Sequence, residues 1–240
     1  MKTLLASAVF LALAVPATAA TVSVSGFSTS DYGTATRSMS NAVTQDFEGY
    51  GEGNVSNGFS TNVGTFSSLG GKGSGGTVSN AGFANDGTKL ALRDGNVYGR
   101  VSTTQDLTGN SADDMFLDSN DTQGIVWDVM LGAGRMFDRI VFTLTDAAEF
   151  GNSMKIATAY GEAVYSNSGN GEKRLVEIYF GKAVGSAKIT LGHFKGSNPR
   201  TNDGFSIDDI AVNEVPLPAS ALLLLGGLGG LMAMRRRNNA

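Results

Sequence analysis

The chain has 240 residues with 33 glycines and no cysteine, which excludes disulfides, thiolate catalysis and cysteine-ligated zinc. Four of its 18 Lys and Arg residues (Lys2 and Arg235–Arg237) lie in the end segments, which leaves 14 basic against 22 acidic residues in the body, a net charge of −8. Binding to a nucleic-acid backbone requires a basic surface, so we expect no nucleic-acid partner.

The first segment, residues 1–20, is typical of a cleaved secretory signal peptide. Lys2 supplies a positive start, and the apolar run from Leu4 to Val15 is too short to span a bilayer. Ala17-Thr18-Ala19 offers the small residues that signal peptidase requires. We therefore expect signal peptidase to cut after Ala19 or Ala20 and the protein to be exported across the inner membrane.

The body, residues 21–214, shows no clear repeat and no long helical periodicity. Short runs of alternating β-branched and aromatic residues recur between turn signals instead. Strands are expected near residues 22–27, 44–49, 89–93, 97–103, 125–131, 137–146, 155–160, 174–180, 188–194 and 204–212. Residues 49–87 are rich in Gly, Ser and Asn, and they predict loops with short edge strands or a flexible insertion.

This pattern predicts an all-β fold, an antiparallel β-sandwich of the jelly-roll type. Phe137, Ile140 and Phe142 break strict alternation within their strand, which predicts a bulge or a strand buried on both faces. Trp127 lies in mid-strand and is expected in the core, whereas Tyr98, Tyr160 and Tyr165 are among the aromatic residues available for binding.

Two short acidic stretches stand at opposite ends of the body, Asp46-Phe47-Glu48-Gly49 and Gly204–Ile210 (GFSIDDI). Their pairing is similar to that in jelly-roll carbohydrate-binding modules of the galactose-binding-like kind. That resemblance implies adjacent first and last strands, with a structural Ca²⁺ shared by Glu48 and one of Asp208 or Asp209. Strand alternation sends these two aspartates to opposite faces, so one points inward and requires a partner. The alternative is that both cap a sheet edge or pair with Lys or Arg.

A third acidic stretch, DDMFLDSNDTQG at residues 113–124, has the composition of a calcium loop. It lacks the Gly and Glu that an EF-hand requires after Asp118, and we interpret it as a solvated turn.

Catalysis is not predicted. His193 is the single histidine and no G-x-S-x-G motif is present, so neither a serine triad nor a zinc site is indicated. A secreted carbohydrate-active hydrolase or lyase that uses a carboxylate pair remains the alternative. The leading expectation is a non-enzymatic β-sandwich that binds extracellular polysaccharide or has a structural role.

The last segment, residues 215–240, begins with Val215, Pro216, Leu217, Pro218 and Ala219, continues without a charge to Met234, and then presents Arg235, Arg236 and Arg237. As a helix, its uncharged run reaches ~24 Å, slightly short of a ~30 Å hydrocarbon core. The positive-inside rule keeps the arginines in the cytoplasm and the body outside the inner membrane. Four glycines (Gly226, Gly227, Gly229 and Gly230) weaken this helix and favour a marginal helix for transient residence; the alternative is a dimer face at the GxxxG of Gly226 and Gly230.

This order of Pro-containing motif, apolar run and terminal Arg cluster resembles the VPLPA variant of the PEP-CTERM sorting signal. Such tails occur on exported proteins of Gram-negative bacteria. The resemblance implies recognition by an exosortase, which would cut near the Pro-containing motif after transient anchoring in the inner membrane. The body would then reach the cell surface or the extracellular matrix. A permanent single-span anchor remains open.

Overall fold

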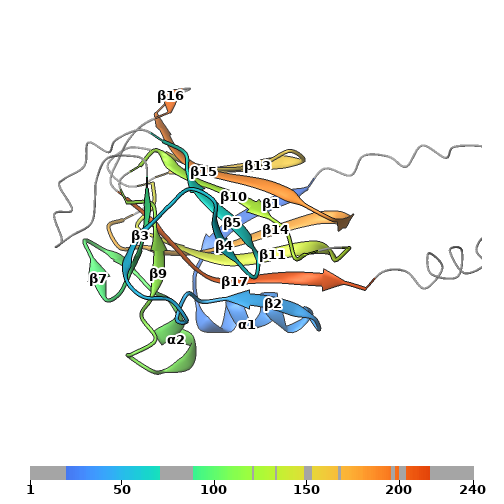
Figure 1. The fold of residues 1–240 in the computed structure, drawn as a ribbon, viewed down its shortest axis with the longest axis horizontal. Coiled ribbons are helices and arrows are strands. Elements are labelled where there is room, and N and C mark those ends of the chain that lie inside the picture. Colours follow the sequence, from blue (N-terminus) through green and yellow to red (C-terminus); the bar gives the residue numbers. More distant parts are fainter. Residues whose placement is uncertain are drawn as a thin grey trace, which may run out of the picture.

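The computed structural model describes residues 20–70, 89–120, 122–132, 134–148, 153–166, 169–195, 198–199 and 204–216. In these ranges the chain is mostly β-strand, and Figure 1 shows two large sheets in two layers. All strand pairs in both sheets are antiparallel, which confirms the predicted all-β antiparallel fold. The predicted signal peptide up to residue 19 and the predicted transmembrane helix lie outside the described residues. No helix within these ranges has the length and apolar character needed to cross a membrane.

The first sheet follows the order β1-β14-β11-β17-β9-β6-β3, and β2 also pairs with β17. Its strands are β1 (Thr21–Gly26), β2 (Ala42–Gln45), β3 (Gly53–Val55), β6 (Leu90–Arg93), β9 (Phe116–Asp118), β11 (Met136–Thr145), β14 (Lys173–Val184) and β17 (Ser206–Val215). The second sheet follows the order β13-β12-β15-β10-β5-β4, and β16 also pairs with β15. Its strands are β4 (Phe59–Thr61), β5 (Gly64–Ser68), β10 (Gly124–Val129), β12 (Ser153–Thr158), β13 (Gly161–Ser166), β15 (Ala187–Lys195) and β16 (Asn198–Pro199).

The core lies between the two sheets. Phe66 on β5 stacks on Trp127 of β10 with ring centroids 5.3 Å apart, and Trp127 meets Phe142 of β11 edge-on at 6.0 Å. Trp127 is fully buried, and its Nε1 donates to the backbone oxygen of Val63 at 3.1 Å, so its polar atom is satisfied. Its predicted place in the core is confirmed.

Strand β11 departs from regular pairing. Its register shifts against β14 between Phe137 and Arg139, and against β17 also between Val141 and Thr143. From Ile140 to Thr145 the strand is buried at every position. Both features predicted for this strand, a bulge and burial on both faces, are therefore present.

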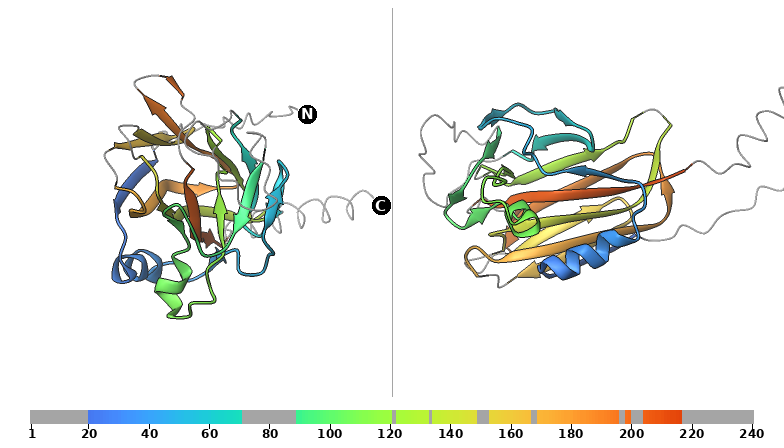
Figure 2. Two further views of the ribbon diagram at one scale, coloured as in Figure 1. Left: turned by 90° about the vertical axis from the view of Figure 1, so that its left-hand side faces the viewer. Right: turned by 90° about the horizontal axis from the view of Figure 1, so that it is seen from below.

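Helix α1 (Thr29–Arg37) was not predicted from the sequence. Ser28 caps it, because its Oγ accepts from the backbone N–H of Asp31 at 3.1 Å. Ala35 and Met39 pack against Leu175 and neighbouring residues of the first sheet, so the helix covers the outer face of that sheet (Figure 2). The helix has nine residues, too few to give a clear helical period in the sequence.

The two ends of the described body leave the sandwich at the same end. β1 starts there and β17 finishes there, whereas a separate small hairpin, β7 (Asn96–Val97) and β8 (Arg100–Val101), stands at the opposite end (Figure 1). The short helix α2 (Thr104–Thr108) follows the hairpin directly. This hairpin end carries the candidate site.

Candidate functional site

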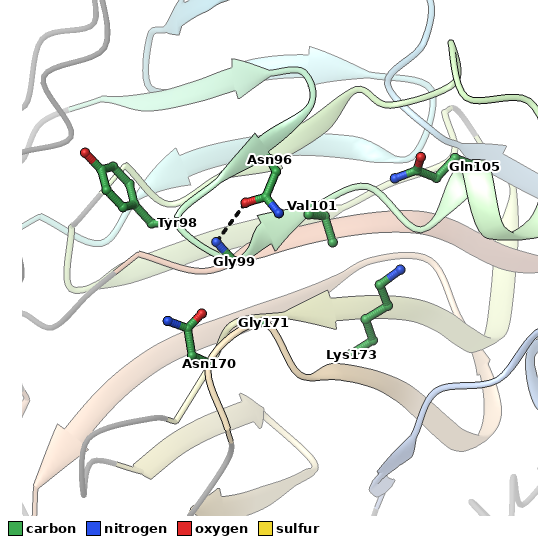
Figure 3. A pocket seen from close by; sticks show the side chains of 8 residues that line it. All are labelled: Asn96, Tyr98, Gly99, Val101, Gln105, Asn170, Gly171 and Lys173. Carbon is green, nitrogen blue, oxygen red and sulfur yellow. Dashed lines mark hydrogen bonds between the residues drawn. The ribbon is translucent and has the colours of Figure 1, made fainter.

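A pocket of about 560 Å³ opens where the β7–β8 hairpin, the start of α2 and the segment before β14 meet (Figure 3). Polar and small residues surround it: Asn96, Tyr98, Gly99, Val101, Gln105, Asn170, Gly171 and Lys173. The alternation at residues 97–103 predicts one continuous strand, and that prediction is wrong. The chain reverses direction at Tyr98 and Gly99, so the same residues form a tight hairpin beside the pocket.

Tyr98 occupies an unfavourable backbone position. Its φ is 54° and that of Gly99 is 99°, so both turn residues have the positive φ found in two-residue type I′ hairpins. Asn or Gly is preferred there, because a residue with a larger side chain pays about 1–2 kcal/mol in the left-handed region. The Tyr98 side chain is 60% exposed, the largest exposure among the large hydrophobic residues of the described chain. Burial therefore compensates little of this strain, and strain at an exposed aromatic points to a functional role.

Gly99 brings the two walls of the pocket into contact. A Cβ at this position would lie 2.3 Å from Oδ1 of Asn170 and 3.0 Å from the backbone N of Gly171. The same N–H of Gly171 donates to Oδ1 of Asp146 at 2.7 Å, which holds the second wall. The positive φ favours glycine at position 99, and a Cβ there would displace the Asn170 amide and crowd the backbone N of Gly171.

The polar groups of the pocket are mostly uncharged. Figure 3 shows nitrogen atoms of Asn96, Gln105 and Lys173 pointing toward the space between them. Oδ1 of Asn96 accepts from the N–H of Gly99 at 3.0 Å, which orients this amide. Lys173 forms an ion pair with Asp106 of α2, and both side chains are partly exposed. An aromatic ring with several amides is a lining suited to hydroxyl-rich ligands.

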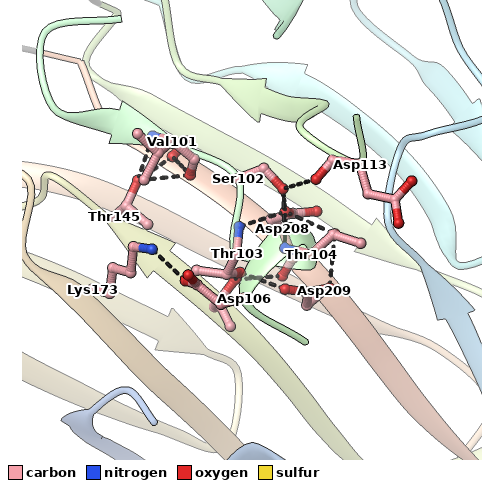
Figure 4. A network of polar contacts seen from close by, with 12 residues as sticks. Val101, Ser102, Thr103, Thr104, Asp106, Asp113, Thr145, Lys173, Asp208 and Asp209 are labelled. Atoms are coloured by element: carbon pink, nitrogen blue, oxygen red, sulfur yellow. Dashed lines mark hydrogen bonds and ion pairs between the residues drawn. The ribbon is translucent and has the colours of Figure 1, made fainter. Parts of the chain in front are cut away.

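Directly behind the pocket wall, residues 102–104 hold the two aspartates of β17 (Figure 4). Oδ2 of Asp208 accepts from Oγ of Ser102 at 2.6 Å and from the backbone N–H of Thr103 at 3.0 Å. Oδ1 of Asp209 accepts from Oγ1 of Thr104 at 2.9 Å, and its Oδ2 accepts from Oγ1 of Thr103. Val101 and Gln105, which flank this segment, line the pocket, so the aspartates fix the wall from behind.

The expectation that Asp208 and Asp209 point to opposite faces is wrong. Oγ1 of Thr104 lies 3.2 Å from Asp208 and 2.9 Å from Asp209, so both carboxylates are on the same side. The cause is the second register shift of β11, which pairs Thr143 with Asp208 but Val141 with Ala211. Asp209 lies in this irregular stretch with a φ of 47°, and the bulge turns its side chain toward that of Asp208.

These carboxyl groups titrate abnormally. Burial raises the pKa of Asp208 well above its ordinary value, and the neighbouring charge of Asp209 raises it further. Burial also raises the pKa of Asp209 to about 6, although the hydroxyls of Thr103 and Thr104 act in the opposite direction. In Glu48, burial raises the pKa to about 7, with smaller contributions from nearby acidic groups.

The structure brings Asp208 and Asp209 together but joins Glu48 to them only indirectly. Oε1 of Glu48 accepts from the backbone N–H of Met115 at 2.9 Å. Among the described residues, no group of three or more His, Asp or Glu side chains is arranged to hold a metal ion. One observation favours an additional ligand: within the same part of the chain, the buried Oδ1 of Asp208 has no hydrogen-bonding partner. The calcium assignment stays a prediction.

The interpretation of residues 113–124 as a solvated turn is wrong in its second half. Asp118 ends strand β9 and is fully buried, with Oδ2 2.5 Å from Nε of Arg93 and Oδ1 3.3 Å from Nη1 of Arg100. Asn120 is also buried and accepts from Nη2 of Arg93 at 2.9 Å. A carboxylate buried with two guanidinium groups is paired rather than solvated, and the partners come from strands remote in the sequence.

His193 is buried on β15, with its ring edge-on to Phe205 at 5.2 Å. Neither ring nitrogen has a hydrogen-bonding partner in the described part of the chain, and burial lowers the pKa of His193 to about 4. The residue is placed as a core side chain.

The structure covers only the start of the predicted sorting motif. Val215 is the last residue of β17 and pairs with Met136, and Pro216 follows as an exposed residue. The rest of the motif and the Arg cluster lie outside the described residues: Leu217, Pro218, Ala219, Arg235, Arg236 and Arg237.

The Tyr98 pocket was missed from the sequence alone. The available signal was Tyr-Gly between two short β-branched pieces (NVYGRV), which fits a two-residue hairpin as well as a strand. No protein-family model matches the chain, and a search of curated proteins finds no match.

Proposed function

We propose that this protein is an exported, non-enzymatic β-sandwich protein that binds a glycan in the Tyr98 pocket. The observation that carries the proposal is Tyr98 itself, an exposed aromatic held at positive φ beside a pocket lined by amides. An aromatic face packs against the C–H face of a sugar ring, and amide groups bond its hydroxyls. Tyr98 is 60% exposed, so burial in the core does not explain a tyrosine at this turn.

The finer fold proposal is a jelly roll like that of galactose-binding-like modules. Its support is the pairing of β2 with β17, in which Gln45 is opposite Ile210. This pairing brings Asp46-Phe47-Glu48, which follows β2, beside the Asp208-Asp209 segment. The early and late acidic stretches therefore lie close together. The first strand of the structure, β1, pairs with β14 and not with β17, so the expected adjacency of first and last strands holds only for β2.

We also propose a structural Ca²⁺ near this junction, with Asp208 as the aspartate ligand. Both carboxylate oxygens of Asp209 accept hydrogen bonds from threonine hydroxyls, whereas Oδ1 of Asp208 has no partner among the described residues. Ca²⁺ takes carboxylate and backbone oxygens, and Glu48 is linked to this region through the backbone N–H of Met115. Oγ of Ser102, which donates to Asp208, lies 3.5 Å from the backbone oxygen of Asp113.

Export, exosortase-dependent sorting and final residence at the surface or in the matrix remain parts of this proposal, supported by the two terminal sequences. Mass spectrometry of both termini of the mature protein tests them. A new N-terminus after Ala19 or Ala20 and a C-terminus near the Val215–Ala219 motif are expected. An intact C-terminus on a membrane-retained form would show a permanent anchor instead.

A glycan panel tests the binding proposal. The wild-type body is expected to bind at least one glycan, and Tyr98→Ala is expected to abolish binding. Tyr179→Ala is the matched control, because Tyr179 is also half-exposed but lies outside the pocket. The same panel, assayed for newly released sugar ends, tests the alternative of a hydrolase or lyase. Loss of binding in both variants, or in neither, would contradict the proposed role of Tyr98 in glycan binding.

A further inference from the structure

The Tyr98 pocket has one charged lining residue, Lys173, and that charge is already compensated. Its Nζ forms an ion pair with a carboxylate oxygen of Asp106 on α2 (Figure 4). The side chains are 28% and 36% exposed, so the pair lies at the pocket wall and is only partly hydrated. Within the part of the chain that the structure describes, the pocket therefore presents no uncompensated positive charge to a ligand.

The surroundings of this pair are acidic. Asp208 and Asp209 lie behind the neighbouring Ser102–Thr104 segment, where Oγ1 of Thr104 is 3.2 Å from Asp208 and 2.9 Å from Asp209. The body as a whole carries a net charge of −8 once the two ends are set aside. An anionic ligand would have to enter this field without a free cation to receive it, and the field would lower its local concentration.

The remaining lining groups suit an uncharged ligand. Asn96, Gln105 and Asn170 contribute amides that donate and accept hydrogen bonds without a net charge. Of the ion pair, only Lys173 lines the pocket; its ammonium donates to hydroxyl oxygens, and Asp106 balances its charge from outside the lining.

We infer that the pocket selects neutral sugars and excludes uronic acids and other acidic sugars, with Asp106 as the specificity-determining residue. This inference rests on the proposed glycan-binding function. Asp106 acts through its ion pair with Lys173, because this pair balances the positive charge that Lys173 would otherwise present to a ligand. Without Asp106, Lys173 becomes a free cation that can receive a carboxylate.

The test compares soluble neutral polymers (laminarin, dextran, galactan) with uronate polymers (alginate, polygalacturonate) by calorimetry. Wild-type protein is expected to bind a neutral polymer with an affinity that salt changes little, because no charge pair with the ligand is formed. Asp106→Asn is expected to gain uronate affinity by about tenfold, as for a hydrogen bond to a charged group. This gain is expected to fall at high salt and to disappear in the double variant Asp106→Asn/Lys173→Gln.

Asp128→Asn is the matched control. Asp128 pairs with Lys188 at 3.3 Å on an exposed strand surface outside the pocket, and its replacement changes the net charge by the same amount. It is expected to gain no uronate affinity. A thermal melt of each variant verifies folding.

Three results would overturn the inference, and each can be told from the others. Salt-sensitive preference of the wild type for uronates, lost in Tyr98→Ala, would leave the binding site intact and remove its selectivity for neutral sugars. An equal gain in Asp106→Asn and Asp128→Asn would show a general charge effect and remove Asp106 as the selector. If neither class of polymer binds, or binding survives in Tyr98→Ala, the proposed function fails and the inference with it.

Discussion

Replacing Tyr98 by Asn and by Ala separates the backbone strain of the hairpin from the function of the ring. Both replacements remove the aromatic ring, and the buried part lost is small because the side chain is 60% exposed. With about 200 Å² for a whole aromatic side chain, some 80 Å² is buried, so the loss is at most about 2 kcal/mol in either variant.

The two variants differ in their tolerance of positive φ. Tyr98 has a φ of 54°, a conformation that Asn adopts readily and Ala does not. The Asn variant is therefore expected to be more stable than the Ala variant by about 1 kcal/mol, with strain relief offsetting much of the lost burial. For a body of this size that difference corresponds to about 2–4 °C in Tm.

Denaturant unfolding of the two variants, alongside the wild type, measures the difference, and calorimetric titration measures glycan affinity. Both variants are expected to lose binding. Equal stability of the two would refute the assignment of strain to Tyr98. Retained binding in the Asn variant would refute the role of the ring.

Three further predictions concern neighbouring features. Gly99→Ala is expected to cost about 1 kcal/mol more than Gly109→Ala by denaturant unfolding. Both positions have positive φ, but only a Cβ at Gly99 meets Asn170 and Gly171 of the opposite wall. Equal costs would contradict the close approach. The pKa of His193 is lowered to about 4, so this group binds fewer protons in the folded state and stability falls as pH drops from about 6.5 to 4, by about 3 kcal/mol at most. His193→Phe is expected to flatten this acid limb in pH-dependent melts, and an unchanged limb would assign it to other groups. For Asp208, whose pKa is raised, the sign is opposite, and stability falls as pH rises above its ordinary value of 3.8. Calcium at neutral pH is then expected to raise Tm by several degrees, since free calcium at 100 Kd adds about 2.7 kcal/mol to the free energy of unfolding. A melting temperature unchanged by EDTA, or a calcium response retained in Asp208→Asn, would contradict the calcium proposal.

The sequence predicted the long strands well because their period is local. β10, β11, β14 and β17 each contain a run of alternating or doubly buried residues, and all four lie close to their expected positions. The break in alternation at Phe137–Phe142 even indicated the bulge. These signals depend on neighbours within a few residues, which a sequence displays directly.

The errors arose where backbone conformation or distant partners decide the outcome. Tyr98 and Asp209 both have positive φ, which no strand pattern reveals, and each redirects the chain or a side chain. Asp118 becomes buried because Arg93 and Arg100 from other strands meet it. The candidate site combines both cases. Of the residues that line the pocket, only Tyr98 was singled out from the sequence, as one of several aromatic residues available for binding.

Both ends of the described body lie at one end of the sandwich, and the hairpin that carries Tyr98 lies at the other (Figure 1). Strand β14, with twelve residues at about 3.3 Å each, extends over roughly 40 Å of the sandwich. If either terminus attaches the body to a surface, every copy presents Tyr98 at the end farthest from that surface. Neighbouring copies would then present identical pockets at one distance from the surface. A long repetitive polymer would bind many of these weak sites at once.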